Sequence, residues 1–217
     1  MARNLLKAGH AVTVWNRTGS KCDALVGEGA ERGGSPAAVV GACDVIFAML
    51  SDPAACRATV FGAEGVLAGL ESAGGKGKGY VDMSTVDAET STAISTAVTA
   101  AGGRFLEAPV SGSKGPAIDG SLVIMAAGDE GLNTEVSALL DVMGKKTFYL
   151  GADVGAGARM KLVVNMVMGT MMGAFAEGMA LAEKSDLSQQ MLLDILDLGA
   201  MSNPMFRLKG KAVLNQS

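Results

Sequence analysis

Histidine is almost absent from this chain of 217 residues, since His10 is the single example. Catalytic triads that activate a serine or cysteine need a histidine as general base. His10 follows Gly9 at the predicted end of a short helix, where a capping role fits better. The three cysteines, Cys22, Cys43 and Cys56, lack the spacing of metal ligands. We therefore expect no metal site and no nucleophilic hydrolysis, and we expect reduced thiols in a cytosol-like compartment.

A concentration of positive charge is also missing. The chain has 18 Lys and Arg against 22 Asp and Glu, and its formal net charge is −4. Proteins that bind nucleic acids or anionic lipid gather Lys and Arg into a patch or stripe. We therefore expect no nucleic acid and no membrane surface among the partners. Because no signal peptide precedes the first amphipathic helix, we expect a cytoplasmic protein.

The glycine-rich turn of dinucleotide-binding folds, G-x-G-x-x-G, does not occur in the sequence. That turn joins the first strand to the helix whose N-terminus holds the cofactor pyrophosphate. Gly27, Gly29 and Gly33 come close, but one residue too many separates the last two. The chain opens instead at a predicted helix, Ala2–Ala8. Either the fold is of another kind, or the first strand and its turn lie before Met1.

Apolar runs alternate with helical patterns over most of the chain. The predicted strands are Ala11–Trp15, Val45–Leu50, Tyr80–Met83, Arg104–Pro109, Leu122–Ala127 and Thr147–Leu150. The predicted helices among them are Lys21–Val26, Ser35–Gly41, Asp52–Val60, Asp87–Ala101 and Leu132–Met143. Such alternation is typical of a sheet that helices cover on both faces. We predict an α/β fold with a doubly wound, mostly parallel sheet of Rossmann type.

The strands stop near Gly151, and one long helix is predicted over Gly155–Lys184. A shorter helix, Ser188–Asp197, and a poorly patterned tail follow. We therefore predict two domains: residues 1–152 form the dinucleotide-binding domain without its first strand, and residues 153–217 begin an all-helical domain. The apolar stretch Leu162–Ala182 has the length of a membrane span. It contains Glu177 and lacks flanking aromatic residues, so we favour burial between two halves of a soluble protein over a membrane anchor.

Two polar residues stand at the head of the long helix. Lys161 and Asn165 are four residues apart, so they lie on one helix face. The ammonium of Lys161 can lie in solvent, or it can donate a proton to a carbonyl oxygen as hydride reaches the carbon. Asn165 would then orient the substrate or the lysine. The sequence alone leaves both interpretations open.

Asn16, Arg17 and Thr18 follow the first predicted strand, where a dinucleotide fold meets the adenosine ribose. An acid at this point binds the 2′-hydroxyl of NAD, and none occurs from Val14 to Thr18. An arginine with two neutral donors suits the 2′-phosphate of NADP, because guanidinium and phosphate pair in a two-pronged geometry. An ordinary solvated turn is equally compatible.

Other strand exits carry polar groups, and such exits line the ligand crevice of open α/β sheets. Ser84 and Thr85 follow one strand, although either of them can simply cap the next helix. The turn Ser111-Gly112-Ser113 follows another strand. Its N–H groups and hydroxyls can hold a small carboxylate, and a plain turn remains the alternative.

Five stretches in this order carry a family resemblance. They are VTVWNRTGSKCDALV (Val12–Val26), YVDMSTVDAETS (Tyr80–Ser91), GRFLEAPVSGSKGPA (Gly103–Ala117), KLVVNMVMGTMMGAFAEGMALAEKS (Lys161–Ser185) and LLDILDLGAMSNPMF (Leu192–Phe206). Together they resemble the β-hydroxyacid dehydrogenase family, and within it the plant-type glyoxylate/succinic semialdehyde reductases. The resemblance implies NADPH-linked reduction of glyoxylate to glycolate and of succinic semialdehyde to 4-hydroxybutyrate. Another 3-hydroxyacid dehydrogenase activity and a non-catalytic interaction module are the alternatives.

The resemblance also implies roles for single residues. Lys161 matches the catalytic lysine and Asn165 the asparagine one turn later. The turn Ser111-Gly112-Ser113 matches the loop that binds the substrate carboxylate, and Asn16, Arg17 and Thr18 match the 2′-phosphate site. The positions along the nicotinamide side of the crevice match Met49, Leu50 and Thr85. Some relatives replace the lysine with an apolar residue and lose the chemistry, whereas this sequence keeps it.

The sequence departs from the family at both ends. The first strand, its glycine-rich turn and most of the C-terminal helical bundle are absent. We therefore expect a fragment or a mis-bounded gene model that binds NADPH poorly, and a full-length form that is a homo-oligomer. The missing strand is central in the order 3-2-1-4-5-6, so its loss leaves two unpaired edges. Any organelle-targeting peptide would precede that strand.

Overall fold

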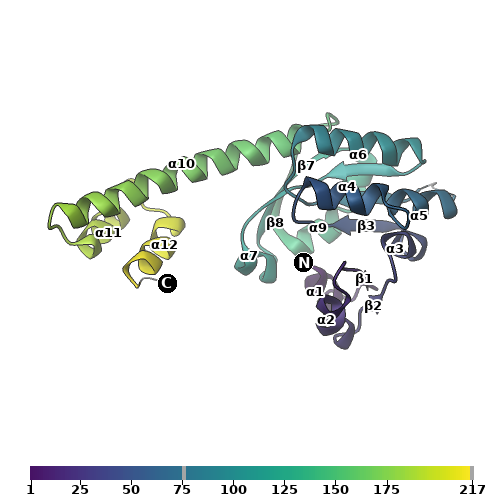
Figure 1. Ribbon diagram of the computed structural model, residues 1–217, viewed down its shortest axis with the longest axis horizontal. Coiled ribbons are helices and arrows are strands. Elements are labelled where there is room, and N and C mark those ends of the chain that lie inside the picture. The colour runs from purple at the N-terminus through teal and green to yellow at the C-terminus, as the bar shows by residue number, and fades with distance from the viewer. Residues whose placement is uncertain (75–76, 216–217) are drawn as a thin grey trace. The chain divides into compact units, whose positions relative to one another are not determined.

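The computed structural model describes residues 1–74 and 77–215, which form two compact units, Met1–Leu162 and Val163–Ser217 (Figure 1). The first unit contains all the strands among these residues. They are β1 Thr13–Val14, β2 Glu31–Arg32, β3 Val45–Ala48, β4 Gly79–Asp82, β5 Arg104–Glu107, β6 Val110–Ser111, β7 Leu122–Gly128 and β8 Gly144–Tyr149. The first unit is therefore of the predicted α/β class.

Helices alternate with these strands. They are α1 Ala2–Lys7, the 3₁₀ helix η1 Gly19–Cys22, α2 Asp23–Gly27, α3 Pro36–Ala42, α4 Pro53–Phe61, α5 Val66–Ser72, α6 Ala88–Ala100, α7 Lys114–Ile118, α8 Glu130–Glu135 and α9 Ser137–Met143. Two of them begin with the same device, since Ser35 and Asp52 accept hydrogen bonds from the first turn and a proline follows each. The sequence missed α5, and it joined α8 and α9, which Val136 separates.

The main sheet is mostly parallel, as predicted. Its order is β3-β4-β5-β7-β6, and β8 pairs with β7. The pairs β3–β4, β4–β5 and β7–β8 are parallel, whereas β7 runs antiparallel to β5 and β6. The strands β1 and β2 form a separate parallel pair. Within the described residues no strand joins this pair to β3, as expected when the central first strand of a doubly wound sheet is missing.

The core lies on both faces of the main sheet. Successive residues of a strand point to opposite faces. Val81 and Leu106 accordingly face α1, α8 and α9, while Tyr80 and Phe105 face α3 to α6. The rings of the latter pair stack with centroids 6.2 Å apart. Helices on both sides explain why β4 is buried at every position (Figure 1).

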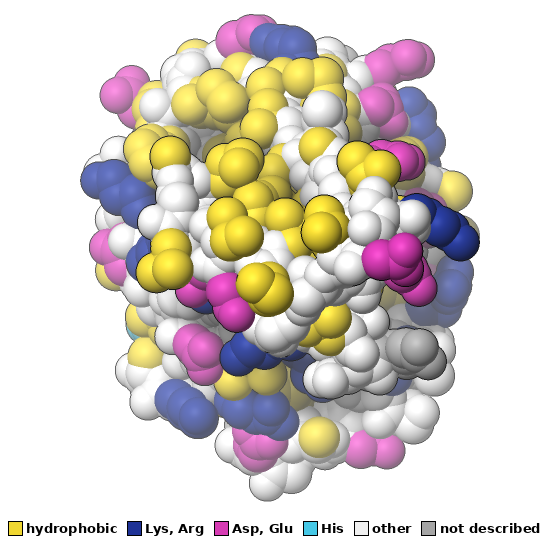
Figure 2. All heavy atoms as spheres, turned by 90° about the vertical axis from the view of Figure 1, so that its left-hand side faces the viewer, with side chains coloured by type: hydrophobic (Ala, Val, Ile, Leu, Met, Phe, Trp, Pro, Cys, Tyr) yellow, Lys and Arg dark blue, Asp and Glu magenta, His cyan; other side chains and the backbone are white. Residues whose placement is uncertain are grey.

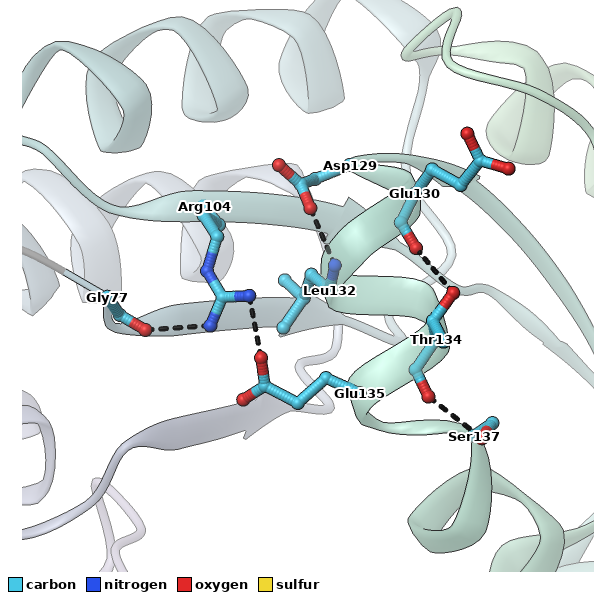
Figure 3. A network of polar contacts seen from close by, with 8 residues as sticks. All are labelled: Gly77, Arg104, Asp129, Glu130, Leu132, Thr134, Glu135 and Ser137. Atoms are coloured by element: carbon cyan, nitrogen blue, oxygen red, sulfur yellow. Dashed lines mark hydrogen bonds and ion pairs between the residues drawn. The ribbon is translucent and has the colours of Figure 1, made fainter.

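Arg104 at the start of β5 fastens the sheet to α8. Its guanidinium donates to a Glu135 carboxylate oxygen at 2.6 Å and to the Gly77 carbonyl at 2.7 Å (Figure 3). Asp129 caps the same helix by accepting a hydrogen bond from the Leu132 N–H. These contacts fix the end of the sheet opposite to the strand exits that concern the chemistry.

A single continuous helix, α10 (Ala156–Lys184), confirms the predicted long helix and spans the boundary between the two units. In the second unit it is followed by α11 Gln189–Leu198 and α12 Pro204–Leu214. Phe175 of α10 stacks on Phe206 of α12 with ring centroids 4.6 Å apart. The predicted poorly patterned tail is wrong, because Asn203 caps α12 and Pro204 opens it.

The predicted burial of Leu162–Ala182 is not found among the described residues. Only 11% of the most apolar 18-residue stretch of α10 is buried, and Met166 is 63% exposed. Apolar side chains likewise gather on the surface that faces the viewer in Figure 2. By length and composition α10 is also the one helix of the described residues that could cross a membrane.

Candidate active site

Three parallel strands end side by side. Ala48 of β3 is in register with Asp82 of β4, which is in register with Glu107 of β5. Backbone hydrogen bonds continue this row, from the Met83 N–H to the Ala48 carbonyl and from the Ala108 N–H to the Asp82 carbonyl. The segments that follow the three strands therefore emerge at one edge of the sheet, where open α/β sheets bind their ligands.

The exits of β3 and β4 are joined by a serine. The Leu50 N–H donates to Ser84 Oγ at 2.9 Å, and the Ser84 N–H donates to Asp82 Oδ1 at 2.9 Å. Thr85 is half-buried beside them, and Met49 is exposed. The sequence allowed Ser84 or Thr85 to cap the next helix, but the N-cap residue of α6 is Asp87. Ser84 thus positions the β3 exit.

Asp82 is a buried acid that sequence analysis missed. Asp82 is 2% exposed, and its Oδ2 atom has no hydrogen-bond partner among the described residues. Burial raises the pKa of this carboxyl, contacts with Ser84 lower it, and the neighbouring Glu107 raises it further. Asp82 therefore gives up its proton less readily than an exposed aspartic acid.

Lys161 is buried near the start of α10 and belongs to the first unit. It is 8% exposed, and burial lowers the pKa of its ammonium. Most of the Lys161 side chain is therefore covered by protein, and both interpretations of its ammonium stay open. No carboxylate of the described residues lies within ion-pair distance of Lys161. Asn165 follows one turn later in α10, is half-buried and falls in the second unit.

The turn after β1 carries the predicted phosphate ligands. Asn16, Arg17 and Thr18 are exposed, and Asn16 Oδ1 accepts a hydrogen bond from the Thr18 N–H at 2.9 Å. The pKa of Asp52 is lowered first by the Ser51 hydroxyl and then by backbone N–H groups, with a smaller contribution from Arg17. The Arg17 side chain is exposed and therefore accessible to an anion.

The turn Ser111-Gly112-Ser113 joins β6 to α7. Gly112 has φ +137°, and a Cβ there would lie 2.8 Å from Leu122 and 2.9 Å from Pro116, so only glycine fits. Ser113 precedes α7 without capping it through its hydroxyl. Ser113 is exposed and Ser111 half-buried. The turn thus presents two hydroxyls that can bind a small anion.

Glu107 is the second buried acid that sequence analysis missed. Oε1 accepts hydrogen bonds from the N–H groups of Gly155 and Gly157, both at 2.7 Å, and Oε2 accepts one from Ser91 Oγ at 2.6 Å. The donors in the glycines lie 48 and 50 residues away in sequence. An acid that ends a strand immediately before Ala-Pro was the only local signal.

Comparisons with known sequences cover the whole chain. A family model for the NAD binding domain of 6-phosphogluconate dehydrogenase matches residues 1–151. A second model, for the NAD-binding domain of NADP-dependent 3-hydroxyisobutyrate dehydrogenase, matches residues 155–217. The chain belongs to the β-hydroxyacid dehydrogenase family. This membership confirms the resemblance and the fold class, and it makes the chain part of an NADP(H)-dependent oxidoreductase.

The individual relatives include proteins of different names. Glyoxylate/succinic semialdehyde reductase 1 of Arabidopsis thaliana is 58% identical over 100% of this chain, which spans 73% of that protein. The cytokine-like nuclear factor N-PAC of Homo sapiens is 51% identical over 97% of the chain, which spans 37% of that protein. Among solved structures, 3-hydroxyisobutyrate dehydrogenase (ygbJ) of Salmonella typhimurium is 26% identical with a TM-score of 0.87, covering 99% of this chain and 74% of that one.

The described residues fit an NADP(H) cofactor at the sheet edge. Arg17 is exposed and no acid occurs from Val14 to Thr18, which is compatible with a 2′-phosphate at this turn. Leu50 and Thr85 stand at the exits of neighbouring strands, where a nicotinamide would lie in this fold. The cofactor-binding roles of these residues and of Met49 stay predictions. The position of the domain boundary at residue 152 also stays a prediction.

Proposed function

We propose that the protein is an NADPH-dependent reductase of small aldehydes that carry a carboxylate, with glyoxylate and succinic semialdehyde as its substrates. The observation that carries the proposal is Lys161, a lysine that is buried in the family fold yet keeps an ionisable ammonium with a lowered pKa. A general acid works best when its pKa lies near the working pH. The 58% identity to a plant reductase of these two aldehydes supports the choice of substrate.

The roles follow from the chemistry of each group. When bound, NADPH supplies a hydride to the aldehyde carbon. Lys161 donates a proton to the aldehyde oxygen, so that an aldehyde, NADPH and one proton give an alcohol and NADP⁺. Ser111 and Ser113 bind the substrate carboxylate through hydroxyl and N–H groups. Asn165 orients the substrate, and Arg17 with Asn16 and Thr18 holds the 2′-phosphate.

The test is NADPH oxidation by the complete gene product that contains this chain. Glyoxylate and succinic semialdehyde are compared with butanal, which has an aldehyde but lacks a carboxylate. We expect turnover of the two carboxylate-bearing aldehydes and a KM for butanal at least about 10-fold higher, because charge-assisted hydrogen bonds are lost. Equal use of butanal would contradict the role of the Ser111–Ser113 turn. Equal use of NADH would contradict the role of Arg17.

A non-catalytic protein is the second candidate, and the 51% identity to a protein named as a nuclear factor favours it. The largely buried Lys161 argues for catalysis, because an ammonium whose pKa is lowered by burial is suited to proton transfer. The assay also includes 3-hydroxyisobutyrate, an alcohol that is tested with NADP⁺. If the protein binds NADPH but turns over neither this alcohol nor any carboxylate-bearing aldehyde, the non-catalytic candidate is favoured. A cytoplasmic location and a homo-oligomeric full-length form stay predictions.

A further inference from the structure

Glu107 joins three elements of the first unit through one carboxylate. It ends β5, is 2% exposed, and accepts its three hydrogen bonds from α6 and from the head of α10. The N–H groups at the start of a helix have no partners within the helix. A carboxylate there is further stabilised by the positive end of the helix dipole. Glu107 thus satisfies two donors that α10 itself leaves free.

Two glycines make the contact possible. Gly155 has φ +100°, which favours glycine, and a Cβ there would lie 3.1 Å from Ala88 Cβ. A Cβ on Gly157 would lie 2.7 Å from the Met125 carbonyl oxygen and 3.1 Å from Glu107 Oε1. Any larger residue at 157 would therefore push the first turn of α10 away from β5 and β7. The helix is seated directly on the strands.

Hydrogen-bond donors surround the carboxylate of Glu107. Among the described residues every partner of its two oxygens is a donor, so both oxygens are satisfied inside the core. Asp82 lies in register with Glu107 on β4, and burial and then Glu107 raise the pKa of its carboxyl. The hydrogen bonds of Glu107 are thus directed to α6 and to the start of α10.

The contact determines where Lys161 lies. Gly157 and Lys161 are one helical turn apart, so they share a face of α10. Two hydrogen bonds to one carboxylate oxygen fix both the height and the rotation of the first turn. We propose that Glu107 is a positioning residue that sets the place of the Lys161 ammonium through the first turn of α10. The proposal rests on the function proposed for Lys161.

The test compares three variants in the complete gene product. Glu107→Ala removes both bonds to α10, whereas Glu107→Gln keeps a carbonyl oxygen of the same reach that can accept them. Ser91→Ala is the matched control, because it removes the bond to Oε2 and leaves α10 untouched. The readouts are amide hydrogen exchange of residues 155–161, and kcat and KM for NADPH with succinic semialdehyde.

We expect Glu107→Ala to speed exchange at Gly155 and Gly157 and to lower kcat by about 100-fold, because a misplacement of about 1 Å has that effect. The KM for NADPH should change by less than about 3-fold, since Arg17 and the β1 turn are remote from the change. Glu107→Gln and Ser91→Ala should stay within about 3-fold of the unchanged protein in kcat.

Equal losses in the Gln and Ala variants would overturn the proposal, and so would faster exchange with an unchanged kcat. If Glu107→Ala gives no folded protein, Glu107→Asp replaces it, because the shorter side chain cannot reach both N–H groups. The proposal then requires the Asp variant to lose kcat and the Gln variant to keep it. Lys161→Ala separates the two proposals: full turnover in that variant refutes the role of Lys161, whatever Glu107 does.

Discussion

The two parts of α10 differ in what they bury. In its first six residues the helix buries Gly157, Ala158 and the charged Lys161. Beyond Leu162 it exposes apolar side chains, with Met166 at 63% and Val167 at 59%. The lysine is thus buried in the part of α10 that has few apolar residues. The apolar side chains are exposed in the part that has few charged residues. Composition alone would have assigned the environments the other way round.

The difference shows that neighbours decide burial along this helix. The head lies against the end of β5, where Glu107 binds two of its N–H groups, and against Met125 in the middle of β7. Beyond the boundary at Leu162, the residues of α10 that are buried are Phe175, Met179 and Ala182. Buried polar groups need specific partners and are thus typical of functional sites. We therefore place the proposed chemistry at the head of α10.

The largest expected effect separates the two parts by activity. Lys161→Ala should lower kcat for succinic semialdehyde by about 1,000-fold, because a positioned general acid contributes about 10²–10⁴-fold. Lys184→Ala, at the exposed end of the same helix, is the matched control and should leave kcat unchanged. Steady-state oxidation of NADPH by the complete gene product measures both. A comparable loss of kcat in Lys161→Ala and Lys184→Ala would contradict the difference between the two parts of α10.

The next effect contrasts two methionines of the exposed part. Met179 is 2% exposed, so Met179→Ala should lower the free energy of unfolding of the helical unit by about 2–4 kcal/mol. Met166 is 63% exposed, and Met166→Ala should change it by less than about 0.5 kcal/mol. Urea unfolding followed by circular dichroism gives both values. A large cost at Met166 would mean that protein covers this face in solution.

Two glycines of α10 offer a smaller and sharper contrast. Gly157→Ala places a Cβ 2.7 Å from the Met125 carbonyl oxygen, and we expect a loss of about 1–3 kcal/mol in stability. A Cβ on Gly169 meets nothing within 4 Å, so Gly169→Ala should gain about 0.5–1 kcal/mol through helix propensity. Thermal unfolding of the two variants decides. A gain in both variants would show that the start of α10 does not pack tightly against the strands.

The smallest effect concerns Asp82 beside the head. Its pKa is raised in the folded protein, so the native state keeps the proton that the unfolded chain releases. Stability is therefore highest below the ordinary pKa of an aspartic acid and falls as the pH rises through the raised one. Asp82→Asn removes this titration and should flatten the dependence of unfolding free energy on pH. A dependence unchanged by the substitution would show that the fold does not raise the pKa of Asp82.

Local signals in the sequence predicted much of the fold. The pairs Ser35-Pro36 and Asp52-Pro53 placed two helix starts, and Lys161 stood out at the head of an apolar helix. The start of α12 carries the same signal, Asn203-Pro204, which was overlooked. Glu107 could not be assigned a role, because its donors lie 48 and 50 residues further along the chain. The exposure of α10 depends on neighbours that periodicity does not describe.

The pH dependence of kcat/KM for succinic semialdehyde tests the central claim most directly. If Lys161 donates the proton, activity is lost as the pH rises through its pKa, which burial places below the ordinary value for lysine. We predict an alkaline decline in the unchanged protein with a midpoint below that ordinary value, and no such decline in the residual activity of Lys161→Ala. The same alkaline decline in both proteins would contradict the assignment of Lys161 as the proton donor.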